Sequence, residues 1–89
     1  MDKKYKFNIG DVVTLSEVQD YIQLNVKNDE YRIVHKGELL IVRERKCFHG
    51  ANEYSFEGDC RTLNSDFGFP EDWFVAAPNK FGFSSRRVD

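Results

Sequence analysis

Apolar and polar residues alternate along much of this chain, which is the period of a β-strand with one buried face. Residues 21–26 show the alternation most clearly, with Ile22, Leu24 and Val26 on one face. The run 39–46 is apolar at its start and charged at its end on both faces, so it predicts a strand that leaves the core and enters solvent. One face of this run carries Leu39, Ile41, Arg43 and Arg45, and the other carries Leu40, Val42, Glu44 and Lys46.

Short apolar runs separated by turn residues predict the other strands. Turn compositions occur at residues 27–30, 36–38, 49–52 and 58–59, and residues 60–66 form a polar loop. Pro70, Glu71 and Asp72 predict a one-turn 3₁₀ segment. The predicted strands cover residues 11–15, 31–35, 53–57, 67–69 and 74–77.

Residues 16–22 fit two interpretations. Ser16 and Gln19 have the spacing of a capping box, and Val18, Tyr21 and Ile22 have helical spacing. The same segment runs into the strand pattern of residues 21–26. We favour a short helix or turn at residues 17–20, followed by a strand.

Five or six short strands with little helix predict a small all-β barrel or sandwich. The chain has a lead rich in lysine and phenylalanine, Gly10-Asp11-Val12-Val13, a long first loop, a hairpin, the Tyr54-Ser55-Phe56 strand and a closing element of acidic and aromatic residues. In this order the features resemble small Src-homology-3-like (SH3-like) barrels, modules that recur among short phage and bacterial proteins. The resemblance implies a binding module built on loops at one rim, and no functional residue carries over from it. Its matching segments are Phe7–Leu15, Tyr31–Arg45, Glu53–Gly58 and Phe69–Ala77.

Composition supports one intracellular domain. The chain has 89 residues, with 13 basic and 15 acidic residues that leave a net charge of −2, so there is no global basic footprint. We predict an SH3-like domain at residues 1–77 and a tail at residues 78–89 that orders only on binding. Without a signal peptide or an apolar run long enough to span a membrane, and with Cys47 and Cys60 expected to be reduced, the prediction is a cytoplasmic protein.

The sequence lacks a recognisable catalytic or metal-binding pattern. Cys47 and His49 are separated by one residue, closer than zinc-binding pairs usually are, and neither His35 nor Cys60 supplies a second close pair. The adjacent carboxylates of the Glu71-Asp72 pair seldom point into one pocket, and we expect them to cap a turn. We therefore predict no enzyme activity, no metal and no cofactor.

Aromatic density near the C-terminus instead favours protein binding. We expect Trp73 and Phe74 to be core residues, whereas Phe81 and Phe83 are open to either interpretation. Exposed aromatic side chains rimmed by charge are typical of interface hot spots, and arginine can make bidentate contacts to acidic groups. The resemblance further suggests a phage-encoded accessory protein or an inhibitor of a host factor. The predicted partner-binding residues are Tyr21, Phe67, Phe69, Phe81, Phe83, Arg86 and Arg87.

The alternative is a nucleic-acid-binding barrel. Its phosphate contacts would come from basic residues expected around one end of the barrel, and it predicts a steep loss of affinity with salt. Acidic residues such as Glu44, Glu53 and Asp59 are interspersed there, which weakens this interpretation. The basic residues concerned are Arg43, Arg45, Lys46 and Arg61.

Overall fold

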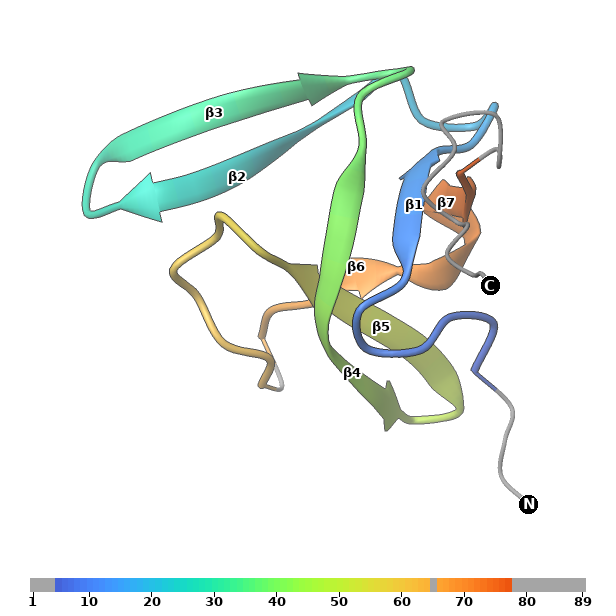
Figure 1. Cartoon of the computed structure of the whole chain (residues 1–89). Coiled ribbons are helices and arrows are strands. Elements are labelled where there is room, and N and C mark those ends of the chain that lie inside the picture. Colours follow the sequence, from blue (N-terminus) through green and yellow to red (C-terminus); the bar gives the residue numbers. More distant parts are fainter. Residues whose placement is uncertain (1–4, 65, 78–89) are drawn as a thin grey trace.

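The structure, a computed structural model, describes residues 5–64 and 66–77. It confirms the all-β class and the 3₁₀ turn near residues 70–72. Residues 17–20 form a turn and not a helix, and the following strand begins at Tyr21. The elements in chain order are β1 (Val12–Leu15), β2 (Tyr21–Lys27), β3 (Glu30–His35), β4 (Leu40–Phe48), β5 (Ala51–Phe56), β6 (Phe69–Pro70), η1 (Glu71–Trp73) and β7 (Phe74–Ala76) (Figure 1).

Two antiparallel sheets make up the described part of the chain. Five strands form a sheet in the order β6-β5-β4-β1-β7, and β2 pairs only with β3 in a hairpin that projects to one side (Figure 1). Within the described residues the predicted barrel does not close, since the edge strands β6 and β7 do not pair with each other. Both edges are short, and Pro70 in β6 has no backbone N–H to donate to a further strand.

The core lies between the two sheets and follows the strand alternation. Val13 and Leu15 of β1 and Ile22 and Leu24 of β2 are buried at every second position. Strand β4 differs from its prediction, since only one of its two apolar faces is buried. On the other face Ile41 is 39% exposed, and Leu39, just before the strand, is 38% exposed. The remaining buried apolar residues are Phe7, Val34, Leu40, Val42, Tyr54, Phe56, Phe69 and Phe74.

A bulge in β4 changes the direction of its charged half. The pairing of β4 with β5 shifts register between Val42 and Glu44, so strict alternation fails there. As a result, Arg43 and Glu44 both reach the loop after β5, although the sequence pattern places them on opposite faces.

The C-terminal aromatic run is only partly core. Phe74 is fully buried, with its ring centroid 4.7 Å from that of Phe56 and 6.2 Å from that of Phe69. Trp73 packs against this core from outside and stays partly exposed. The expectation of a core position is confirmed for Phe74, while Trp73 also contributes to the surface.

Candidate functional site

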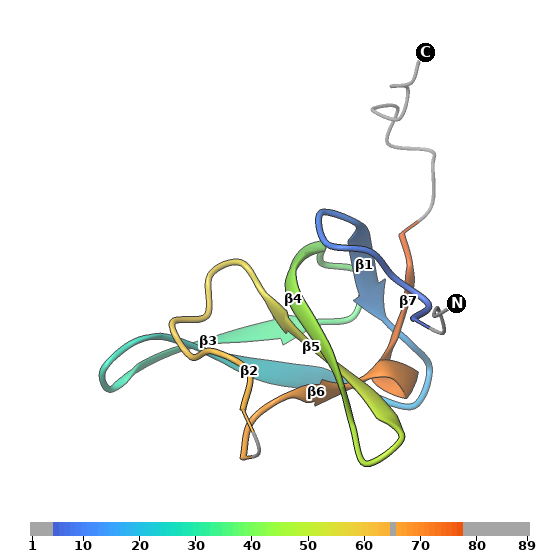
Figure 2. The ribbon, with the colours of Figure 1, turned by 90° about the horizontal axis from the view of Figure 1, so that it is seen from below.

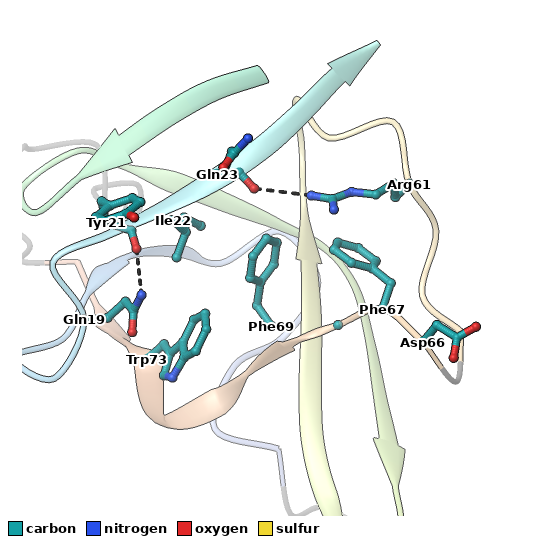
Figure 3. A pocket seen from close by; sticks show the side chains of 10 residues that line it. Gln19, Tyr21, Ile22, Gln23, Arg61, Asp66, Phe67, Phe69 and Trp73 are labelled. Carbon is teal, nitrogen blue, oxygen red and sulfur yellow. Dashed lines mark hydrogen bonds between the residues drawn. The ribbon is translucent and has the colours of Figure 1, made fainter. Parts of the chain in front are cut away.

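An open groove with a volume of about 390 Å³ lies between β2 and the segment that leads into β6 and η1 (Figure 3). Its floor is apolar: Ile22 is buried, and Phe69 is only 8% exposed. Three aromatic side chains from separate parts of the chain line it further. They are Tyr21 of β2, Phe67 before β6, and Trp73 of η1.

The rings in the groove support one another. The Phe67 and Phe69 ring centroids are 5.2 Å apart in an edge-to-face arrangement, and those of Phe69 and Trp73 are 6.3 Å apart. Tyr21 is 52% exposed at the start of β2. The groove therefore presents a row of rings on a buried floor and leaves part of their surface in contact with water.

Gly68 permits a close approach beside the groove. A Cβ at this position would lie 2.8 Å from the Cβ of Glu53 in the neighbouring strand β5. No ordinary side chain fits at that separation, so glycine lets the Phe67–Phe69 segment lie directly against β5. This position of the segment places both phenylalanines in the groove lining.

One end of the groove is polar and is built from the loop after β5. Gly58 has φ +97°, a conformation that favours glycine, and it turns the chain toward β2. The Cys60 N–H donates to the Asn25 carbonyl at 2.7 Å, and the Asn25 N–H donates to the Asp59 carboxylate at 3.3 Å. The loop is thereby attached to the edge of β2 (Figure 2).

Arg61 is held firmly at this end. Its guanidinium lies 4.2 Å from the Phe67 ring centroid, a cation–π contact, and its Nη2 donates to the Gln23 carbonyl at 3.3 Å. Nε and Nη2 of Arg61 also donate to the Asp59 carboxylate at 3.0 and 2.7 Å, while the Arg61 backbone N–H donates to it at 2.8 Å.

Asp59 is the buried counterpart of Arg61. Its side chain has 0% exposure. Burial acts to raise the Asp59 pKa, but the hydrogen bonds from the Arg61 side chain and from the Arg61 and Asn25 backbone outweigh burial, so the pKa lies below its ordinary value. The carboxylate is thus ionised at neutral pH and fixes the loop to β2.

A second carboxylate ties the N-terminal segment to η1. Glu71 Oε2 accepts hydrogen bonds from the Lys6 N–H at 2.9 Å, from Asn52 Nδ2 at 3.1 Å and from the Tyr54 hydroxyl. Burial acts to raise the Glu71 pKa, and these donors lower it further than burial raises it. Burial, followed by the hydrogen bond to Glu71, raises the pKa of Tyr54. The Glu71 network is structural, as it lies outside the groove lining.

Acid is expected to destabilise the fold through these two carboxylates. Both folded-state pKa values lie below the ordinary values of 3.8 for Asp59 and 4.5 for Glu71, so their stabilisation is complete above those values. It is lost as the pH falls from about 4.5 through the folded-state pKa values. Urea unfolding at several pH values should show this loss. In the variants Asp59→Asn and Glu71→Gln the loss between pH 5 and pH 3 should be smaller, and an unchanged slope in both would contradict the assignment.

The predicted partner-binding residues fall into two groups. Tyr21, Phe67 and Phe69 come together in the groove, with Phe69 as its floor. The remaining predicted residues lie outside the described residues. They are Phe81, Phe83, Arg86 and Arg87.

The four cations of the nucleic-acid alternative all have partners within the chain. Arg43 donates to the carbonyls of Asp59 and Arg61. Lys46 donates to the Asn64 carbonyl, so these two cations and Arg61 lie along one loop. Arg45 instead donates to the Phe7 carbonyl at 3.2 Å and stacks over Tyr5. The structure therefore separates Arg45 from the other three.

The groove also includes residues outside the predicted partner-binding set. Gln19 and Gln23 contribute polar atoms, and Arg61 was assigned to the alternative site. Asp66 lies at the same end as Arg61. Sequence gives no signal for the positions of Arg61 and Asp66, because these depend on the segment after β5 lying against β2.

Metal ligands and membrane-spanning helices are not found in the described ranges. Cys47 and Cys60 are free and exposed, and within residues 5–64 and 66–77 no three His, Cys, Asp or Glu side chains are grouped to hold a metal. The same residues include no helix long and apolar enough to cross a membrane. Comparison of the chain with protein-family models, curated proteins and solved structures finds no match.

Proposed function

We propose that this chain is a non-enzymatic binding module whose groove engages another protein. The observation that carries the proposal is the row of partly exposed rings of Tyr21, Phe67 and Trp73 over the buried floor formed by Phe69. Aromatic side chains anchored on a rigid base lose little conformational entropy on binding and supply large apolar contact areas. Such clusters supply much of the affinity at protein interfaces.

The electrostatics favour a protein over a nucleic acid. Arg61, the cation in the groove, is already paired with Asp59, and the net charge of the chain is −2. The other three candidate cations donate to carbonyl groups of the chain. Releasing them for phosphates would cost these hydrogen bonds, so we place nucleic-acid binding second. The alternative still predicts affinity that falls steeply with salt.

The relationship to SH3-like barrels is a further part of the proposal. The order of one strand, a projecting hairpin, two long strands and a 3₁₀ turn before the last strand supports it. A phage-encoded accessory protein or an inhibitor of a host factor is the role that we propose from this resemblance. A protein-binding groove on a small domain is compatible with that role.

Two equally exposed tyrosines provide the test of the groove. Tyr21 lines the groove at 52% exposure, and Tyr31 on the same hairpin lies outside its lining at 53% exposure. We expect Tyr21→Ala to weaken the capture of a protein partner about 10- to 30-fold, the effect of losing a hot-spot side chain, and Tyr31→Ala to leave it within about twofold.

The measurement is a tagged pull-down from lysate of the cells in which the protein naturally occurs, run with and without nuclease and read by mass spectrometry. The proposal requires a protein retained by the wild type and by Tyr31→Ala but lost with Tyr21→Ala. If every partner disappears with nuclease, the nucleic-acid alternative replaces it. If Tyr21→Ala captures the same protein equally well, the groove is not the site.

A further inference from the structure

We propose that the groove receives its partner as an extended strand that pairs with the free edge of β2 at Tyr21 and Gln23. This inference rests on the proposed function and adds how the partner is held. The main-chain carbonyl groups of the partner strand would accept hydrogen bonds from the N–H groups of these two residues. An apolar side chain of the strand would enter between the rings of Phe67 and Trp73, and a basic side chain would lie near Asp66.

The geometry of β2 identifies which backbone groups face the groove. In an antiparallel pair, the N–H and C=O groups of successive residues point alternately toward the partner strand and away from it. Every residue of β2 from Tyr21 to Asn25 is in register with a residue of β3, so the register alone does not tell the two edges of β2 apart. The N–H and C=O groups of Asn25 instead bond to the loop after β5, on the edge of β2 away from β3. By alternation, the backbone groups of Tyr21 and Gln23 point to that same edge.

Side chains already satisfy the carbonyl groups at this edge but not the N–H groups. The Tyr21 carbonyl accepts a hydrogen bond from Gln19 Nε2 at 2.7 Å, and the Gln23 carbonyl accepts one from Arg61 Nη2 at 3.3 Å. Figure 3 shows both bonds along the side of β2 that borders the groove. The N–H groups of Tyr21 and Gln23 point away from β3 by this alternation, and among residues 5–64 and 66–77 no turn, loop or side-chain acceptor is found for them. The complementary ligand therefore presents acceptors spaced along an extended chain, as a β-strand does.

At Asn25, the next outward-facing residue of β2, the loop after β5 already makes the hydrogen bonds that a neighbouring strand would make. Its Cys60 N–H and Asp59 carboxylate bond to the outward C=O and N–H groups of Asn25. The edge of β2 is thus covered at Asn25, whereas at Tyr21 and Gln23 side chains occupy the carbonyl groups and leave the N–H groups for a partner. An added segment would continue the pairing that the loop begins.

The charges around the groove select the side chains of the segment. The positive charge of Arg61 is balanced by Asp59 at 2.7 Å. Asp66 lines the same end, and its carboxylate has no ion-pair or hydrogen-bond partner within the described ranges. The unbalanced charge of the groove is negative, which favours a basic residue. The rings of Phe67 and Trp73 favour an apolar one.

The probe for this proposal is a 12-residue peptide selected from a random display library on the full chain. We expect selected peptides to share an apolar and a basic residue. At saturation, NMR should show a shift of the indole N–H signal of Trp73, the single tryptophan, and amide exchange at Tyr21 and Gln23 slowed about tenfold or more. A Trp73 shift with unchanged exchange at both amides would overturn strand pairing and leave a protein-binding groove intact.

Two variants sharpen the test. Gln23→Pro removes the N–H at an edge that faces away from β3, and we expect it to bind the peptide about tenfold more weakly than Gln23→Ala, which removes the same side chain but keeps the N–H. Equal binding by both would contradict the proposal. If Gln23→Pro does not fold, the amide-exchange measurement on the wild type decides.

Two further outcomes would also overturn strand pairing. One is that both amides exchange slowly in the free chain and rapidly after truncation at Ala77. Residues 78–89 would then be what occupies the edge of β2. The other is that no library peptide shifts the Trp73 signal. In that case a protein still captured through Tyr21 in the pull-down would keep the proposed function, and loss of that capture as well would reject both.

Discussion

Replacing Phe74 with alanine is expected to lower the free energy of unfolding by about 3–5 kcal/mol. The Phe74 ring is fully buried between Phe56 and Phe69, and its removal leaves a cavity that the two sheets cannot close by side-chain adjustment alone. A domain of this size has a total stability of roughly 5–15 kcal/mol, so the variant should unfold in much lower urea or not fold at 37 °C.

The next residue along the chain provides the control for this prediction. Val75 lies on the opposite face of β7 at 42% exposure, and Val75→Ala should cost less than about 1 kcal/mol. Urea unfolding followed by circular dichroism measures both variants. Similar losses in the two would contradict the core that we describe, because a fully buried phenylalanine ring removes far more apolar area from water than a half-exposed valine does.

Replacing Asp59 with alanine is expected to cost about 3–5 kcal/mol and to remove one end of the groove. The carboxylate is fully buried and accepts hydrogen bonds from Arg61 and from the Asn25 N–H. Without it, the half-buried Arg61 guanidinium keeps its charge but loses its counter-charge, and the loop after β5 loses an attachment to β2. Partner binding should fall together with stability.

An exposed ion pair serves as the comparison for Asp59. Asp20 lies 3.5 Å from Lys36 with its side chain 90% exposed, so Asp20→Ala should change stability by less than about 0.5 kcal/mol. Chemical unfolding compares the two aspartates directly. If Asp59→Ala were as mild as Asp20→Ala, the buried pair would not be what fixes the loop.

The strands could be predicted from sequence because their alternation is local. Ile22 and Leu24 are buried as their spacing predicts, and β4 and β5 lie close to their predicted ranges. The bulge between Val42 and Glu44 could not be predicted, since a single inserted residue leaves no pattern of its own. Because of this bulge, the prediction that Arg43 and Arg45 share a face is wrong.

The aromatic residues of the candidate site could be predicted from the sequence, whereas its polar end could not. Aromatic density near the C-terminus predicts Phe67 and Phe69, the long first loop supplies Tyr21, and the fold brings the three together. The role of Arg61 depends on Asp59 being buried against β2, a contact between segments more than thirty residues apart. Such long-range contacts decide whether a cation is free to bind a ligand or already paired.

The most direct test of the groove is photo-crosslinking from two matched positions. A benzoylphenylalanine residue is introduced at Tyr21 in one variant and at Tyr31 in another, and each is irradiated in nuclease-treated lysate. We predict a discrete protein adduct from position 21 and none, or a much weaker one, from position 31, because only Tyr21 lines the groove. Adducts of equal strength from both positions, or an adduct from position 31 alone, would contradict the assignment of the groove as the protein-binding site.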